Sequence, residues 1–342
     1  MTTAAGEQSL AQQSGRSARS KAPVFVVGCP RSGTTLLYHM LLSAGGFVVY
    51  RAESHSFNLL AHRFGNLKSA SSRAALADAW PRSKAFRISG LDESEVRDAI
   101  SRCRCAGEFL QSIMKAMAVR QGVTRWADTT PDHLLYLSEI KRQIPDALFI
   151  HIIRDGRDVA LSYAQQGWSH PLPWDKGEEL SVAALYWQWS VQRGRESGSK
   201  LAGDYLEIRF EDLVGSPQKS LPRIGAFIDH VLDAERIQSA AIGSVSKPNT
   251  SFKTDSGQFD PLERWKKQLN PEQLLQLELL IGDSLHELDY PLANEISGYK
   301  ASFWIRRLRW TYPKLSSTKL WLKDHTMLGR LSDTSPMNWG AE

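Results

Sequence analysis

The chain has 342 residues, a hydrophobic fraction of 42 % and a formal net charge of +5. These values allow one large α/β domain with a substantial core, and the mildly basic balance suits an anionic ligand without predicting a nucleic-acid partner. No apolar segment reaches the roughly 18 residues that a membrane span needs. Three cysteines give neither a disulfide framework nor a zinc-ligand spacing, so we expect a cytoplasmic protein without a metal site.

Residues 1–21 are polar and aperiodic, which is typical of a disordered leader. A nearly continuous apolar run begins at Pro23, as expected for a strand buried on both faces, and leucines at helical spacing follow from Leu36. Residues 47–50, FVVY, are predicted as a second strand. Later segments near residues 124, 148 and 205 repeat the order of strand, loop and helix.

This repetition predicts a P-loop-type parallel sheet flanked by helices on both faces, in a single main domain over residues 22–292. Ligands of such a fold bind beyond the carboxyl ends of the strands. Residues 293–342 are basic and aromatic and are predicted as a helical C-terminal appendage. This extension either packs on the domain or contacts a membrane surface or a carrier domain.

The loop GCPRSGTT, residues 28–35, follows the first strand and carries the strongest functional signal. Gly33 allows a turn in which amide groups point at one anion, and a helix beginning near Thr34 adds its N-terminal N–H groups. Arg31 supplies a permanent charge, and Thr35 a further hydroxyl. The loop lacks the Gly-Lys-Ser/Thr ending of an ATP-binding P-loop.

A second signal follows the apolar run LFIHII, where Arg154 opens the sequence RDGRD and Ser162 lies eight residues later. Both side chains can reach one phosphate if Arg154 lies in the turn before the helix. Considered alone, RDGRD is equally typical of a surface cluster of Arg–Asp pairs.

Together these stretches resemble the sulfotransferase family, whose members use 3′-phosphoadenosine 5′-phosphosulfate (PAPS) without a metal. The resemblance covers roughly residues 23–292. It implies that PRSGTT binds the 5′-phosphosulfate and that Arg154 and Ser162 bind the 3′-phosphate, which ATP lacks. The donor-binding residues that it implies in these two segments are Arg31, Ser32, Gly33, Thr34, Thr35, Arg154 and Ser162.

The segment 251–269 resembles the loop of basic residues and a tryptophan that closes over the nucleotide in this family. The resemblance assigns the following residues to the donor: Arg264, Trp265, Lys266 and Lys267. Lys253 would lie on a lid. The alternative is that residues 264–269 are the solvated start of a helix. Two positions depart from the family pattern. Phe210 stands where many relatives have tyrosine, and Thr129 stands where related bacterial sequences often have lysine.

Transfer to a hydroxyl needs a general base. Glu53, shortly after residues 47–50, resembles the base of the protein-tyrosine and glycan branches of the family. His55 is the alternative base or an orienting group, and a plain polar turn is the third interpretation. We expect in-line displacement, in which Glu53 takes the proton while Arg31, the loop amides and the threonine hydroxyls stabilise the developing charge.

The acceptor is a hydroxyl-bearing molecule, and a carbohydrate, a lipid or a small natural product is favoured over a protein. The loop 165–178, with Trp168 and Trp174, is a candidate to face it. Core packing is the more ordinary account of the tryptophans at 168, 174, 187 and 189, in which Trp189 shares a helical face with Tyr186 and Trp187 points elsewhere. Two other functions stay open from the sequence: an ATP-dependent small-molecule kinase, and a non-catalytic nucleotide-binding scaffold. Comparing the binding of 3′-phosphoadenosine 5′-phosphate (PAP) with that of ADP separates a sulfotransferase from a kinase. Transfer from PAPS to an acceptor separates an enzyme from a scaffold.

Overall fold

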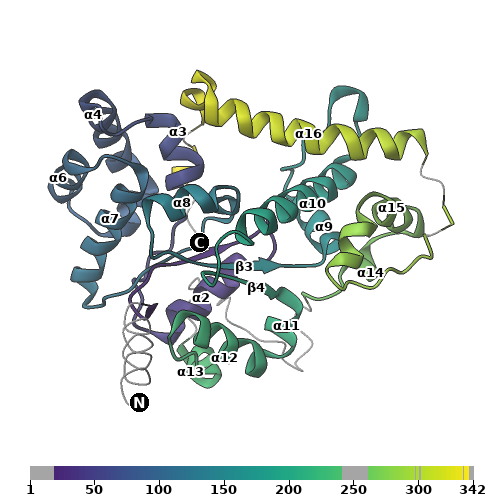
Figure 1. The fold of residues 1–342 in the computed structure, drawn as a ribbon, viewed down its shortest axis with the longest axis horizontal. Helices are drawn as coiled ribbons and strands as arrows, with labels where there is room; N and C mark the ends of the chain where they lie inside the picture. Colours follow the sequence, from purple (N-terminus) through teal and green to yellow (C-terminus); the bar gives the residue numbers. More distant parts are fainter. Residues whose placement is uncertain (1–18, 241–260, 297, 300–301, 334, 339–342) are drawn as a thin grey trace, which may run out of the picture.

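A computed structural model describes residues 19–240, 261–296, 298–299, 302–333 and 335–338. Within these residues, four short strands form one parallel sheet in the order β2-β1-β3-β4. The strands are β1 (Val24–Val27), β2 (Ala127–Asp128), β3 (Leu148–Ile153) and β4 (Tyr205–Arg209). The predicted parallel sheet between helical layers is therefore confirmed (Figure 1).

The two central strands are buried on both faces, as their continuous apolar sequences predict. Alternate side chains enter different cores. Phe25 and Val27 join a cluster with Phe149 on one face, whereas Val24 and Val26 join a second cluster on the other. The period of two along a strand explains this division, and it fixes the register of β1 against β3.

Helices cover both faces of the sheet (Figure 1). One layer contains α2 (Thr34–Ala44), α11 (Phe210–Gly215), α12 (Pro217–Ile228) and α13 (Ala234–Ala240). The opposite layer contains α7 (Ala106–Gln121) and α8 (Leu137–Gln143). A third core joins α9 (Gly156–Gln165) and α10 (Glu179–Gly198) to α15 (Pro271–Glu287) and α16 (Phe303–His325).

The shorter elements complete the chain between these layers. They are η1 (Ser56–Leu60), α3 (Ala61–Phe64), α4 (Ala70–Ala79), η2 (Trp80–Arg82), α5 (Lys84–Ser89), α6 (Glu93–Arg102), η3 (Pro131–Tyr136), η4 (Pro173–Asp175), α14 (Trp265–Gln268), η5 (Met327–Leu331) and η6 (Ser335–Asn338). None of the helices in the described part of the chain is long and apolar enough to cross a bilayer.

The prediction of a strand over residues 47–50 is wrong beyond its first residue. Phe47 makes an isolated parallel bridge with Arg125, and no ladder follows. The side chain of Gln121 explains the interruption, because its amide accepts from Val49 N at 2.8 Å and donates to Val49 O at 3.1 Å. A side chain thus satisfies the backbone groups that another strand would use.

Both ends of the described chain are fixed to the domain. Arg19, which the sequence places in the leader, contacts Asp204 at 2.9 Å and lies over the ring of Phe227; residues 1–18 lie outside the described part. Helix α16 buries Ile305 and Leu308 against the third core. The extension therefore packs on the domain, while its other face stays exposed.

Candidate active site

The candidate site lies where the carboxyl ends of the four strands meet. Because the strands are parallel, the segments that follow them converge at one edge of the sheet. Loop 28–33 follows β1, residues 129–130 follow β2, Arg154 follows β3 and Phe210 follows β4.

The loop after β1 has the geometry that its sequence predicts. Helix α2 begins at Thr34, and Gly33 before it has φ 98°, a conformation that favours glycine. Arg31 also has a positive φ, 76°, which is strained for a residue with a side chain. Ser32 is fully buried, and its hydroxyl has no hydrogen-bond partner in the described structure.

Phe210 gives this loop a tight steric boundary. A side chain at position 33 would overlap the Phe210 ring, and the same ring lies 4.6 Å from the guanidinium carbon of Arg154. The Phe210 ring therefore packs on the loop and on Arg154, and the departure from the family tyrosine removes only a hydroxyl.

Gly33→Ala is expected to lower the free energy of unfolding by about 1–3 kcal/mol and to weaken binding of PAP, because backbone strain and overlap with Phe210 add together. Gly177→Ala is the matched control, since Gly177 has φ 97° but open space around its Cα. Urea unfolding and titration calorimetry measure the two effects. Equal losses in the two variants would show that the Phe210 contact is unimportant.

The structure brings Arg31, Arg154 and Ser162 together, although they are far apart in the sequence. Arg31 Nε donates to Ser162 Oγ at 2.9 Å, and Arg154 Nη1 donates to the carbonyl of Arg31 at 3.3 Å. Arg154 lies in the turn between β3 and α9, which is the condition that the sequence set for a shared phosphate site.

Arg31 and Arg154 lie near other positive groups and have few carboxylate partners in the described structure. Partial burial, followed by the charges of Arg154 and Arg264, lowers the pKa of Arg31. The carboxylate paired with Arg154 is that of Asp158, at 3.3 Å, and the buried Nε of Arg154 has no hydrogen-bond partner among the described residues. Converging guanidinium groups with unused donors are suited to a multiply charged anion.

The predicted closing loop reaches this site only in part. Trp265 is buried, and its backbone N–H donates to Asp158 at 2.9 Å. Lys266 instead pairs with Glu263 at 2.7 Å, and Lys267 is exposed. Arg264 thus lies close enough for its charge to act on Arg31, and Trp265 contacts the carboxylate that pairs with Arg154. Lys266 lies 5.5 Å from the Trp265 ring, and within the described residues neither lysine makes a contact with Arg31 or Arg154; Lys253 lies outside the described part.

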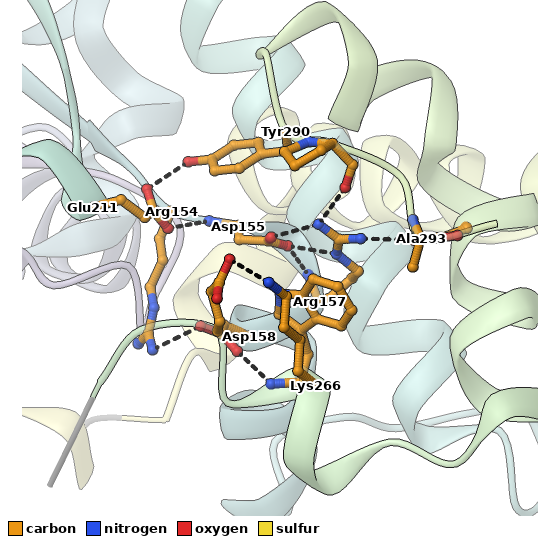
Figure 2. A network of polar contacts seen from close by, with 12 residues as sticks. Arg154, Asp155, Arg157, Asp158, Glu211, Lys266, Tyr290 and Ala293 are labelled. Atoms are coloured by element: carbon orange, nitrogen blue, oxygen red, sulfur yellow. Dashed lines mark hydrogen bonds and ion pairs between the residues drawn. The ribbon is translucent and has the colours of Figure 1, made fainter. Parts of the chain in front are cut away.

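A buried ionic network lies beneath Arg154, and the sequence did not predict it (Figure 2). Arg157 is fully buried, donates to Asp155 at 2.8 Å and to Glu278 at 2.6 Å, and stacks on the Trp265 ring at 3.8 Å. Glu211, after β4, accepts from Asp155 N at 2.9 Å. The alternative of a surface Arg–Asp cluster is therefore wrong. The available signal was a charged cluster that directly follows a fully apolar strand.

Glu53 and His55 face each other across a short gap. His55 Nε2 lies 3.4 Å from Glu53 Oε2, and Asn58 Nδ2 donates to His55 Nδ1 at 3.3 Å. An amide N–H at Nδ1 places the ring proton on Nε2, and that N–H has no hydrogen-bond partner among the described residues. Burial, followed by the charge of His133, lowers the pKa of His55 to about 4, so the imidazole is neutral at pH 7.

The loop that carries this pair is held from the end of β2. Thr130 Oγ1 accepts from the backbone N–H groups of Ser54 at 3.0 Å and His55 at 3.3 Å. Asp128 in turn accepts from Thr130 N at 3.0 Å and from the buried His133 ring at 2.8 Å. Asp128 thus anchors the loop that carries Glu53 and His55.

Several groups set the proton affinity of Glu53. Burial, followed by the charges of Asp132 and Asp128, raises its pKa to about 8. The side chain keeps 39 % of its surface exposed, and solvent on that side moderates the rise. Asp132, which the sequence did not single out, accepts from Tyr186 and Asn58, each at 3.4 Å. A carboxylate with a pKa near the working pH is suited to proton transfer.

A row of aromatic rings joins the two halves of the site. Trp168 lies 5.8 Å from the guanidinium carbon of Arg31, and its ring contacts Tyr163 at 5.6 Å. Tyr186 continues the row at 5.3 Å from Tyr163 and binds Asp132. Trp189 follows and is buried, as is Trp187, whereas Trp174 is exposed. Two hollows lie elsewhere on the described surface, one of 380 Å³ beside Arg195 and one of 620 Å³ beside Asp229. Neither is lined by any of these aromatic residues.

These features define the class: a P-loop-type α/β protein whose anion site uses arginine in place of the loop lysine. Comparison with known proteins then identifies the family. The Sulfotransferase family model matches residues 23–233, which is more than half of the chain. The chain belongs to the sulfotransferase family.

Individual relatives are distant. Carbohydrate sulfotransferase 2 of Mus musculus is 27 % identical over 139 residues, 39 % of this chain and 26 % of its own length. The Homo sapiens protein of the same name is 30 % identical over 110 residues, 31 % of this chain and 20 % of its own length. The chain therefore matches about a quarter or less of these relatives. Among solved structures, the sulfotransferase domain from the curacin biosynthetic pathway aligns over 86 % of this chain and 96 % of its own, with 18 % identity and a TM-score of 0.48.

Proposed function

We propose that the protein transfers the sulfuryl group of PAPS to an acceptor hydroxyl. The observation that carries this proposal is the junction of Arg31, Arg154 and Ser162 beside the glycine turn of the loop. This junction could bind a second phosphate, in addition to a phosphate at the N-terminus of α2. ATP has no group for the Arg154 side, so a kinase leaves this arrangement unexplained.

The residues present fit the donor. The unpartnered Ser32 hydroxyl and the Arg154 Nε are buried and unused in the described structure. The α2 N-terminus, Arg31, Thr34 and Thr35 would hold the 5′-phosphosulfate. Arg154, Ser162 and Arg264 would hold the 3′-phosphate. When bound, the donor supplies an electrophilic sulfuryl group on a phosphate leaving group; no metal ligand set is needed for this chemistry.

Two groups of residues have separate roles in the proposed transfer: one accepts the proton of the acceptor, and the other stabilises the leaving phosphate. Glu53 receives the proton of the acceptor hydroxyl, and His55, whose Nε2 lies 3.4 Å from Glu53 Oε2, helps to position the carboxylate. Arg31 and the N–H groups at the start of α2 stabilise negative charge on the leaving phosphate. Because its pKa is raised, Glu53 binds the proton strongly once it is transferred.

The acceptor is proposed to be a carbohydrate or a similar hydroxyl-bearing molecule. The row of Trp168, Tyr163 and Tyr186 runs between the arginines and Asp132, and aromatic faces of this kind pack on the apolar faces of sugar rings. The named relatives are carbohydrate sulfotransferases, which agrees with this choice.

PAP is expected to bind at least about 100-fold more tightly than ADP in titration calorimetry, because Arg154 and Ser162 make charge-assisted hydrogen bonds only with the 3′-phosphate. Arg154→Gln should remove most of this preference. Arg223→Gln, which removes an exposed charge on α12, is the control and should retain it. Equal affinity for PAP and ADP in the unchanged protein would overturn the donor assignment.

A panel of acceptors incubated with PAPS tests catalysis directly. Mass spectrometry should detect the gain of one sulfuryl group on a hydroxyl compound, and sugars are expected to react first. Tight PAP binding without transfer to any acceptor would instead favour the non-catalytic scaffold.

A further inference from the structure

The positive charge of this protein is concentrated in the region 302–333. These residues contain seven Lys and Arg against two Asp and Glu, a difference of +5, which equals the net charge of the whole chain. The rest of the chain therefore carries equal numbers of acidic and basic residues. The region consists of α16 and the turn η5, and it lies outside the segment 23–233 that defines the family.

The exposed side of α16 also carries large apolar groups. Phe303, Arg306, Trp310, Lys314 and Trp321 share one face, because their spacings of three, four, four and seven residues repeat at the helical period. We name these five residues the outer stripe. Phe303, Trp310 and Trp321 are 77 %, 64 % and 55 % exposed. Met327, Leu328 and Leu331 of η5 extend the apolar surface and are also exposed.

The opposite side of α16 holds the helix in place. Ile305 and Leu308 are buried in the third core, and Tyr312 binds Asp175 at 2.7 Å. Ser317, three residues after Lys314 and four before Trp321, accepts from the indole of Trp189 at 2.9 Å, so the C-terminal half of the helix is also held to the domain. The helix is thus fixed along its length across one side of the molecule, so the outer stripe is a preformed surface (Figure 1).

We propose that the outer stripe docks the protein on an anionic lipid bilayer. Tryptophan at the edge of an apolar surface, with basic side chains beside it, is typical of helices that lie in the membrane interface. Within the described residues, Arg306 and Lys314 have no ion pair, and Lys314 lies 4.0 Å from the Trp310 ring. An acidic protein would also attract this charge. The lipid surface is favoured because the three exposed aromatic rings recur on one face of α16 beside Arg306 and Lys314, an arrangement that suits a broad anionic surface.

Co-sedimentation of the full chain with vesicles tests the proposal, and it does not depend on sulfuryl transfer. Vesicles of phosphatidylcholine with about a third phosphatidylserine should retain the protein at low salt, and pure phosphatidylcholine should retain much less. Raising the ionic strength should release it, because the Debye length falls from about 10 Å at 0.1 M to about 3 Å at 1 M.

Arg306→Gln with Lys314→Gln should weaken binding about 30-fold, since each basic group near an anionic surface contributes about fivefold. Lys219→Gln with Arg223→Gln removes the same charge from exposed positions of α12 and is the matched control, with an expected change below threefold. Trp310→Ala with Trp321→Ala should weaken binding at least tenfold, and Val119→Ser with Val231→Ser, also at exposed sites, should not. Matched thermal unfolding curves confirm that each variant is folded.

Absence of binding to anionic vesicles would overturn the proposal. Equal losses in the α16 and α12 charge variants would also overturn it, because net charge and not this surface would then be responsible. Retention on immobilised poly-glutamate together with failure to bind the vesicles would assign the surface to an acidic protein instead.

Discussion

Replacing Glu53 with glutamine is expected to lower kcat by about 10²–10⁴-fold, the range over which a positioned base contributes. Glutamine keeps the shape of the side chain but cannot accept the proton of the acceptor. PAP affinity should stay within about threefold of the unchanged protein, because Glu53 lies on the acceptor side, apart from Arg31 and Arg154. Steady-state kinetics and titration calorimetry measure the two quantities. Turnover near normal in this variant would exclude Glu53 as the base.

The pH profile gives the same assignment an independent check. Since the pKa of Glu53 is raised to about 8, kcat/KM for the acceptor should rise about tenfold per pH unit below that value and level off above it. A carboxylate with an ordinary pKa would give a profile that is already flat above about pH 5.5. Asp132→Asn should shift the rise to lower pH, because Asp132 is the charged group that raises the Glu53 pKa most, after the effect of burial.

The contribution of Glu53 to the free energy of unfolding should fall as the pH rises, whereas activity rises. Glu53 binds its proton more tightly in the folded state than in the unfolded chain, so its contribution to stability is full below the ordinary value of 4.5 and is lost as the pH rises through about 8. Compared with the unchanged protein, Glu53→Gln should therefore be relatively more stable at pH 9 than at pH 5. Urea unfolding at the two pH values measures this difference. A variant that loses both activity and stability at pH 9 would indicate a structural role.

Replacing Arg157 with methionine is expected to lower the free energy of unfolding by about 3–5 kcal/mol. The guanidinium is fully buried between Asp155 and Glu278, and its removal leaves two buried carboxylates without their partner. Burial alone would lower the pKa of Arg157, but both carboxylates raise it overall, so the group stays charged. Urea unfolding at pH 7 measures the change.

The consequences of this variant should extend to the donor site. Trp265 stacks on Arg157, and the backbone N–H of Trp265 donates to Asp158, which pairs with Arg154. PAP binding to the folded protein should therefore weaken about tenfold or more. Arg157→Lys keeps the charge but loses the planar fork, and an intermediate loss of stability is expected. Arg223→Met, at an exposed position, is the control. A loss below 1 kcal/mol in Arg157→Met would show that the network contributes little.

The sequence by itself determined the parallel arrangement of the sheet and the turn after β1, because both are set by local patterns, although the strand predicted over residues 47–50 does not form. A continuous apolar run followed by a glycine turn and a helix start specifies a buried strand and a phosphate loop wherever it occurs, and Val24–Val27 with Thr34 follows that rule. Arg154 and Ser162 were also predictable, since their spacing places one before α9 and the other on it. The family model matches residues 23–233, a range that contains these segments.

Only the tertiary structure decided which charges are buried and which are solvated. RDGRD is the same string whether its arginines face water or a carboxylate, and the partner of Arg157 is Glu278, 121 residues away. In the same way, Asp132 gained its influence on Glu53 through folding, and Lys266 turned toward Glu263. Such pairings depend on long-range contacts and on desolvation, neither of which has a local period. The outer stripe is the converse case: its helical spacing was present in the sequence, but only the packing of Ile305 and Leu308 determined which face remained exposed.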